Sequence, residues 1–234
     1  YSASLPADEP RDAPDIAELH RAAHPVQPFP QAVHGLIGRG KEFHRFICGA
    51  IHDRKAEEII GRLDYDFSLA DKDAAMHSGV IARTIVLDRL VGEYLAAHPG
   101  ATVMNLACGL DTRCYRMQGY AHWYNLDLPE TIRVRDQIFQ EQGRISTVGK
   151  SVLDPTWHED ITQRGTMLFV IEGLSMYLQP EEVAQMLRII HDNFDNAYVM
   201  METTSPFWVR KQSIEKSVQD TGAVFTWGVN RFSE

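Results

Sequence analysis

The sequence ATVMNLACGLDTR at residues 101–113 joins a short apolar run to a turn that contains glycine. The run 101–107 has the length and composition of one buried strand. Small residues at the start of the turn would let a ligand approach the backbone closely. The nucleotide-binding fingerprint GxGxxG is incomplete, because its glycine positions hold Ala107, Gly109 and Thr112. The stretch therefore predicts a strand and a turn, and leaves open whether the turn binds a ligand or only connects two elements.

Downstream of this turn, short apolar runs alternate with helical stretches. Further strands are expected at 122–128, 145–152, 166–173, 197–204 and 223–228. Helices are expected from Pro129 to about Gln142, over Pro180–Asn193 and near Trp208–Thr221. Such alternation implies right-handed crossovers and an α/β fold, with a mostly parallel, doubly wound sheet covered by helices on both faces.

The chain before residue 99 has a different character. Residues 1–33 contain six prolines and indicate an extended arm or linker. Residues 34–98 show helical periodicity, with helices expected at Arg54–Leu63, where Asp53 suits the N-cap, and at His77–Ala97. We therefore expect an arm at 1–33, a helical lid or N-terminal extension at 34–98, and a Rossmann-like cofactor-binding domain at 99–234.

Composition excludes several classes of function. The 23 Lys and Arg residues against 32 Asp and Glu residues argue against nucleic-acid binding, which needs a basic surface. No apolar run reaches the roughly 18–20 residues of a membrane span, and no leader is expected from the first residues. The ten histidines and three cysteines show no metal-ligand spacing, so no metal site is expected. Buried thiols at Cys108 and Cys114 would suit a cytoplasmic protein.

The expected strand ends carry two acidic residues of interest, since ligands of parallel sheets bind beyond the carboxyl ends of strands. Asp127 follows Gly109 by 18 residues, a spacing typical of a carboxylate that binds a ribose diol, although it could instead cap the next helix. Glu172, followed by Gly173, closes a buried apolar run. A glutamate there is costly unless it faces a site or is paired, and it could also cap the next turn.

Arg83 lies among apolar residues in the helix before the sheet. An arginine in such a place usually extends its head to solvent or pairs with an acid. The alternative is a clamp on a ligand carboxylate, which the forked guanidinium suits. At the end of the third expected strand, Ser151 and Val152 could contact a nucleobase, but alone they indicate nothing.

Four stretches in the same order resemble the leucine carboxyl methyltransferase family, and more closely its bacterial branch of O-methyltransferases of the tetracenomycin polyketide type. These stretches are ATVMNLACGLDTRCYR (101–116), WYNLDLPETIRVR (123–135), SVLDPTW (151–157) and FVIEGLSMYL (169–178). The resemblance runs from about Ile51 to Glu234. It implies a class I, Rossmann-like methyltransferase that uses S-adenosylmethionine.

The resemblance also implies roles for single residues. Arg83 would hold the methionine carboxylate of the cofactor, and the turn at Gly109 would pass under its methionine part. Asp127 would bind the ribose hydroxyls, and Glu172 would lie beside the cofactor at the floor of the site. The full expected cofactor-binding set is Arg83, Asn105, Ala107, Gly109, Asp127, Leu128, Ser151, Val152, Glu172 and Gly173.

Two features depart from the family pattern. The family often has an Asp-Leu pair at the adenine contact, where this chain has Ser151 and Val152. The class I sheet usually ends in an antiparallel hairpin of strands six and seven, but only 223–228 is a candidate here. We therefore expect a truncated hairpin, or a last strand that lies outside this sequence.

The expected function is O-methylation of a small-molecule carboxylate or hydroxyl, for example of a polyketide-like compound. A carboxylate is ionised at pH 7 and needs no base, whereas a phenol with a pKa of about 10 does. Candidate bases near the ends of the fourth and fifth strands are Tyr177, Glu202 and His158. Arg113 and Arg116 could steer an anionic acceptor or form solvent-facing salt bridges.

The acceptor pocket is expected between Phe43–Leu69 and Ser205–Val218, whose aromatic residues suit an apolar or aromatic molecule. Two other functions stay open. One is a nicotinamide-dependent Rossmann oxidoreductase, which the missing glycines disfavour. The other is a cofactor-binding module without turnover.

Overall fold

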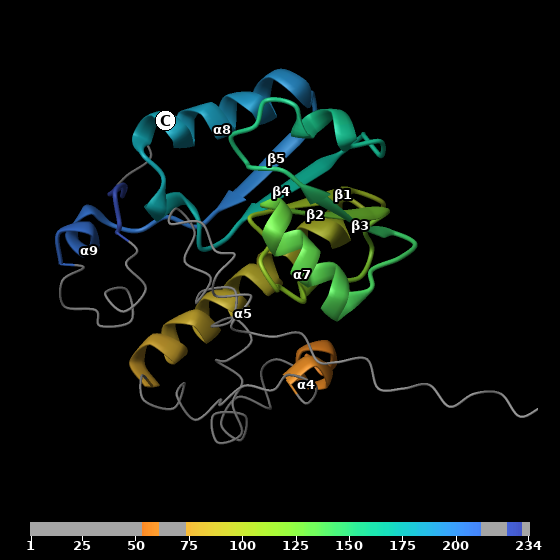
Figure 1. The fold of residues 1–234 in the computed structure, drawn as a ribbon, viewed down its shortest axis with the longest axis horizontal. Coiled ribbons are helices and arrows are strands. Elements are labelled where there is room, and N and C mark those ends of the chain that lie inside the picture. Colours follow the sequence, from red (N-terminus) through yellow and green to blue (C-terminus); the bar gives the residue numbers. More distant parts are fainter. Residues whose placement is uncertain (1–52, 61–73, 212–223, 231–234) are drawn as a thin grey trace, which may run out of the picture.

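The computed structural model describes residues 53–60, 74–211 and 224–230. At its centre lies a five-stranded, fully parallel sheet with the order β3-β2-β1-β4-β5 (Figure 1). The strands are β1 (Thr102–Leu106), β2 (His122–Asp127), β3 (Ile145–Gly149), β4 (Met167–Ile171) and β5 (Ala197–Met201). The strand order reverses between β1 and β4, as in one doubly wound class of α/β proteins.

Helices precede the sheet and connect its strands. They are α4 (Arg54–Ile60), α5 (Ala74–Ala97), α6 (Arg113–Arg116), α7 (Pro129–Phe139), α8 (Pro180–Asn193) and α9 (Pro206–Lys211), with short 3₁₀ turns η2 (Trp157–Asp160) and η3 (Ser175–Tyr177). Proline fits the first helical position because its missing N–H would have no partner there, and both α7 and α8 begin with it. The predicted N-cap of α4 is confirmed: the N–H of Ala56 donates to Asp53 Oδ1 at 2.9 Å.

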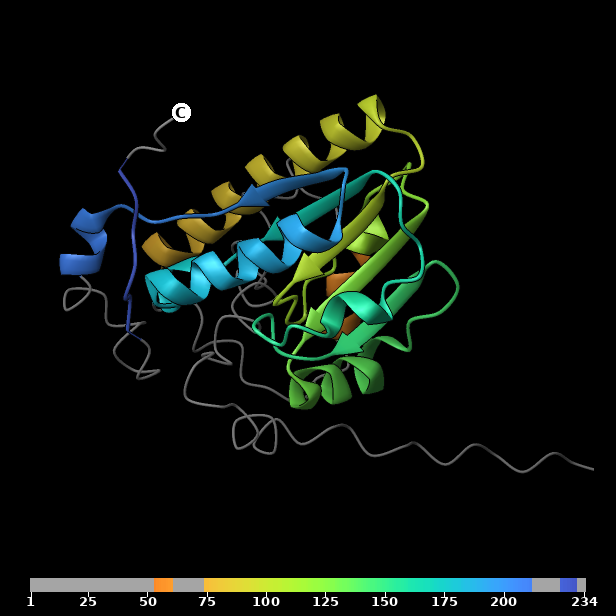
Figure 2. The ribbon, with the colours of Figure 1, turned by 90° about the horizontal axis from the view of Figure 1, so that it is seen from above.

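The two faces of the sheet are covered by different helices. On one face, α8 and η2 pack on β1, β2 and β4 to form the larger apolar core. On the other, α5 packs on the same central strands, and α4 packs against α7. Figure 1 shows α8 above the strands and α5 below them, and Figure 2 shows the same arrangement from the α8 side. The predicted doubly wound α/β fold is therefore confirmed.

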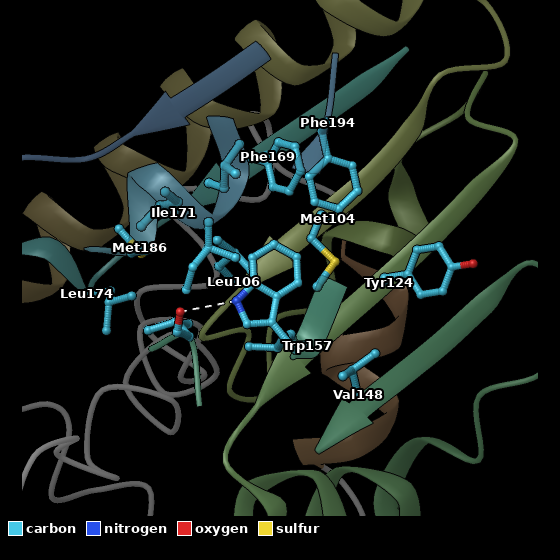
Figure 3. Packing of buried hydrophobic residues seen from close by; sticks show 14 of the residues in the cluster. Met104, Leu106, Tyr124, Val148, Trp157, Phe169, Ile171, Leu174, Met186 and Phe194 are labelled. Carbon is cyan, nitrogen blue, oxygen red and sulfur yellow. Dashed lines mark hydrogen bonds between the residues drawn. The ribbon is translucent and has the colours of Figure 1, made fainter. Parts of the chain in front are cut away.

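Trp157 anchors the larger core on the α8 side of the sheet. Its side chain is completely buried, stacks on Phe194 at 5.8 Å and meets the Phe169 ring edge-on at 6.3 Å. The indole N–H donates to the backbone oxygen of Val152 at 3.2 Å (Figure 3). The tryptophan thus fastens the loop after β3 to the face of the sheet, with its one polar atom satisfied.

Several predicted boundaries shift. β3 ends at Gly149, opposite the last residue of β2, and β5 ends at Met201, opposite the last residue of β4, because neither strand has a partner beyond that point. α7 ends at Phe139 because Gln140 adopts a left-handed conformation with φ 51°. The arm at 1–33 lies outside the described residues, as does the end of the helix predicted near Trp208–Thr221.

The predicted strand at 223–228 is wrong for its described part, because residues 224–230 form no strand. Their backbone N–H groups form hydrogen bonds with the segments that follow β4 and β5 rather than with a strand at the edge of the sheet. The N–H of Thr226 donates to Met176 O, and that of Val229 donates to Thr204 O, each at 2.8 Å. This segment therefore lies against the loops that follow β4 and β5. Among the described residues, no helix is long and apolar enough to cross a membrane.

Candidate active site

The register of the sheet gathers the strand ends at one edge. Leu106 in β1 is aligned with Leu126 in β2 and Ile171 in β4, and Ile171 is aligned with Met201 in β5. The next residues along these strands therefore meet where the strand order reverses. They are Ala107, Asp127, Glu172 and Glu202. This is the place where open parallel sheets bind ligands.

The turn after β1 has an unusual backbone that is tied to the end of β2. Ala107 and Gly109 both have left-handed conformations, with φ of 55° and 48°. A non-glycine residue there costs on the order of 1–2 kcal/mol, and such strain is often found at functional sites. The Gly109 N–H donates to Asp127 Oδ2, and the Leu128 N–H donates to Asp127 Oδ1, each at 2.7 Å. The structure thus brings three predicted site residues together.

The Asp127 carboxyl is 3% exposed. Burial raises its pKa, and the two backbone N–H groups, the Thr131 hydroxyl and the Arg135 charge act in the opposite direction. A carboxyl held this way has a fixed orientation, because both oxygens are bonded to the backbone.

A second group of predicted residues is joined by ion pairs. Arg83 Nε contacts Glu172 Oε1 at 2.7 Å, and its Nη1 lies 3.3 Å from the Glu202 carboxylate. The Gly173 N–H donates to Glu202 Oε2 at 2.7 Å. Burial raises the pKa of Glu202; Arg83 and the Gly173 N–H oppose this, and Glu172 adds to it. Of the interpretations left open for Arg83 and Glu172, pairing with an opposite charge is the one observed.

Arg113 is the centre of a buried ion-pair network. Its side chain is 1% exposed, and it contacts Asp88 at 2.7 Å, Asp111 at 3.0 Å and Glu172 at 2.7 Å. Arg116 contacts Asp88 at 2.6 Å and Asp53 at 2.9 Å. The predicted solvent-facing pairing is therefore wrong, because these guanidinium groups are enclosed by acids of the chain itself. A role in steering an acceptor stays a prediction.

The same network acts on Asp111. Burial alone would raise the pKa of this carboxyl, but the surrounding arginines, Arg113 first among them, lower it to about 2. Asp111 also accepts the Asn105 side-chain amide at 3.0 Å. Asn105 is 3% exposed, so it supports the turn from within the protein.

The third strand end has a more ordinary arrangement. Val152 packs in the core on the α8 side. The Ser151 hydroxyl accepts the Leu153 N–H at 3.2 Å, which shapes the local turn. These contacts do not test the adenine role that the resemblance implies.

The three candidate bases are distributed unevenly. Glu202 lies in the site. Tyr177 lies near it in η3, because the hydroxyl of Ser175, in the same 3₁₀ turn, donates to Glu202 O at 2.6 Å. The placement of His158 near these strand ends is wrong. Arg164 bonds both His158 O and Asn193 O, residues that precede β4 and β5, so His158 lies at the opposite end of the sheet.

Sequence reasoning missed four charged residues around the site. Asp88 and Asp111 bind Arg113, and Arg135 with Glu141 lies behind the Gly109 turn. The one available signal is that Asp88 interrupts an apolar helix face. Within the described ranges no group of His, Cys, Asp and Glu could hold a metal ion; the absence of a metal site stays a prediction.

The parallel sheet, with its candidate site at the switch point where the strand order reverses, is the fold of the class I methyltransferases. A Thermobifida fusca crystal structure, of a protein named as a methyltransferase, superimposes with a TM-score of 0.56 over 75% of this chain and 74% of that one, at 17% identity. At that identity the likeness shows the fold alone. Residues 49–191 match the model of the leucine carboxyl methyltransferase family, and the chain belongs to that family.

Two curated relatives add detail. The tetracenomycin polyketide synthesis O-methyltransferase TcmP of Streptomyces glaucescens is 35% identical over 182 residues, 76% of this chain. The S-adenosyl-L-methionine-dependent methyltransferase dpfgK of Gibberella zeae is 28% identical over 200 residues. This chain spans 66% and 67% of the lengths of these relatives.

Proposed function

We propose that the protein is an S-adenosylmethionine-dependent O-methyltransferase that acts on a carboxylate or hydroxyl group of a small molecule. Membership of the family supports this proposal, as does the named activity of the Streptomyces relative. The observation that carries it is the pairing of the Asp127 carboxylate with the Gly109 turn at the switch point. The family match also disfavours a nicotinamide-dependent oxidoreductase.

The residues at the site fit this cofactor. A carboxylate can accept about four hydrogen bonds. Asp127 accepts two from the backbone, and a third comes from the Thr131 hydroxyl, which can rotate away in favour of a ribose hydroxyl. The Arg83 side chain is 26% exposed and contacts its two acids through Nε and Nη1. Its third nitrogen, Nη2, is then the one that could bind a ligand carboxylate.

The charge around the site also suits a cation. Among the described residues of this network, three guanidinium groups share five carboxylates, an excess of two acids. These groups are Arg83, Arg113, Arg116, Asp53, Asp88, Asp111, Glu172 and Glu202. When bound, S-adenosylmethionine supplies a methyl group on a positively charged sulfur. An acidic surplus at low exposure favours a positively charged ligand over a neutral one. The role of the chain is then to bind, orient and exclude water.

Glu202 is our proposed base for a hydroxyl acceptor. Three groups from the surrounding elements face its carboxylate: Arg83 from α5, and Glu172 with the Gly173 N–H after β4. Since burial raises the pKa of Glu202, the group is a stronger proton acceptor than an exposed glutamate. A carboxylate acceptor would need no such base.

We expect Glu202→Gln to lower the rate of phenol methylation by about 100-fold or more, the usual share of a general base. In the wild type this rate should fall as pH drops through the raised pKa of Glu202, because the protonated carboxyl cannot accept a proton. The variant should lose that acid limb, while methylation of an aromatic carboxylate should change little. Glu181→Gln, at an exposed position of α8, is the matched control. An unchanged pH profile with phenols would exclude this role for Glu202.

Titration calorimetry of the wild-type chain tests the proposal as a whole. We expect binding of S-adenosylmethionine and of its demethylated product, S-adenosylhomocysteine, and none of NAD. Methyl transfer to a panel of aromatic carboxylic acids and matching phenols would then establish turnover. Binding without transfer to any acceptor would favour a cofactor-binding module, and binding of NAD alone would overturn the proposal.

Further parts of the proposal concern the acceptor, the domain organisation and the cellular location. A polyketide-like acceptor is supported by the name of the Streptomyces relative and by Phe207 and Trp208 of α9, which are 53% and 47% exposed. Residues 34–98 are proposed as a helical extension of the domain at 99–234, since α5 carries Arg83 into the site. A cytoplasmic location is supported by two free buried thiols.

A further inference from the structure

Arg135 is a completely buried arginine behind the turn that follows β1. It lies in α7 with no exposed surface, and its guanidinium contacts Glu141 twice: Nη2 to Oε1 at 2.6 Å and Nε to Oε2 at 3.2 Å. The Phe139 ring lies 4.4 Å from the guanidinium carbon. Its remaining nitrogen, Nη1, donates to the backbone oxygen of Gly109 at 2.9 Å.

Glu141 is held just as firmly. Its side chain is 2% exposed and also accepts the Asn125 amide and the Tyr115 hydroxyl, each at 3.2 Å. These partners come from β2 and from α6, so Glu141 fixes the guanidinium against the body of the domain. Bidentate geometry leaves Arg135 little freedom to turn away from Gly109.

The peptide groups of Gly109 are thereby held from two sides. Its N–H donates to Asp127 on the side of the site, and its oxygen accepts from Arg135 on the opposite side. The left-handed conformation of Gly109, with φ of 48°, has no regular helix or strand to maintain it. Removing Arg135 would leave the Gly109 oxygen and the Glu141 carboxylate without their charged partner.

A buried ion pair is expensive, and an apolar pair of similar volume is often as stable or more so. Stability alone therefore does not account for a buried arginine here. We propose that Arg135, fixed by Glu141, is a positioning residue that sets the conformation of Gly109 and, through the Gly109 N–H, the orientation of Asp127. This inference rests on the proposed function, because it assigns Asp127 to the cofactor.

Two measurements on Arg135→Lys test the inference. Lysine keeps the charge but cannot bond Glu141 and Gly109 O as a fork. Titration calorimetry, at a temperature where circular dichroism shows a folded chain, should find S-adenosylhomocysteine bound at least about tenfold more weakly. In the ligand-free protein labelled with ¹⁵N-glycine, the Gly109 amide should exchange with solvent at least about tenfold faster relative to the Gly100 amide. Gly100 donates to Gly119 O before β1, far from Arg135.

Two further variants keep the test decisive. Phe194→Leu weakens the core at the far end of the sheet, and should lower the melting temperature without changing the dissociation constant or the Gly109 exchange ratio. Glu141→Gln removes one charge of the pair and should shift both readouts in the same direction as Arg135→Lys, by a smaller factor. It serves as the test variant if the lysine variant does not fold.

The outcomes separate the two proposals. Wild-type affinity and wild-type Gly109 exchange in Arg135→Lys would overturn the inference while leaving the cofactor intact. Equal losses in Phe194→Leu would also overturn it, since the effect would then follow general stability. If the wild type binds neither S-adenosylmethionine nor its product, the proposed function fails, and the Gly109 exchange ratio alone decides whether Arg135 holds the turn.

Discussion

Asp127→Asn is expected to weaken S-adenosylmethionine binding by about 100-fold or more, because hydrogen bonds to a charged group contribute roughly 1.5–3 kcal/mol each. The amide keeps one oxygen but turns an NH₂ group toward one of the two backbone donors, Gly109 N–H or Leu128 N–H. That donor then has no acceptor, and the ligand hydroxyl on the same side loses its acceptor as well. Titration calorimetry on the folded variant measures the effect.

Asp136→Asn is the matched control for this experiment. Asp136 lies in α7 and is exposed, and its carboxylate accepts a surface bond from the Thr147 hydroxyl at 3.1 Å. The same change of charge there should leave the dissociation constant within about twofold, since an exposed charge is screened by water. An Asp127→Asn variant that binds as tightly as this control would show that Asp127 acts only as a support of the turn.

The parts of this site that the sequence predicts are those with a local signature. An apolar run, a small-residue turn and an acid about 20 residues later fix the relation between Gly109 and Asp127 along the chain. The parallel register then places both at one edge, and the structure confirms that they touch. The positions of the five strands and the starts of α7 and α8 were predictable for the same reason, because apolar runs and proline positions are local features.

Burial of charge was not predictable in the same way. Of the three acids that contact Arg113, Asp88 and Glu172 lie 25 and 59 residues away along the chain, in α5 and after β4. A short helix with two arginines has the local pattern of an exposed segment, and only tertiary packing encloses it. Similarly, nothing local shows that Glu141, just after a helix end, is a buried partner of Arg135.

The prediction of a strand at 223–228 was wrong for a related reason. It is rich in the β-branched and aromatic residues that strands favour, but this composition does not specify a partner. In the described part, Thr226 bonds the carbonyl oxygens of Met176, in η3, and of Leu178, just after it. The extended pattern therefore describes a segment that packs on loops rather than a sixth strand of the sheet.

Arg113→Met is expected to destabilise the protein by about 3–5 kcal/mol, the usual effect of removing one partner from a buried ion pair. Methionine fills much of the space of the arginine stem but leaves the carboxylates of Asp88, Asp111 and Glu172 without the guanidinium that they share. For a chain of this size we expect a fall in melting temperature on the order of 10 °C, measured by calorimetry or circular dichroism.

Arg89→Met provides the control, because Arg89 lies on the same helix as Asp88 but is paired with Glu93 at the surface. That pair is 3.5 Å long with both side chains more than 60% exposed, and losing it should change stability by about 0.5 kcal/mol or less. The contrast between the two variants measures what burial adds to an arginine–carboxylate contact. Equal melting temperatures would mean that water reaches the acids around Arg113, and that the network does not fasten α5 to the ends of β1 and β4.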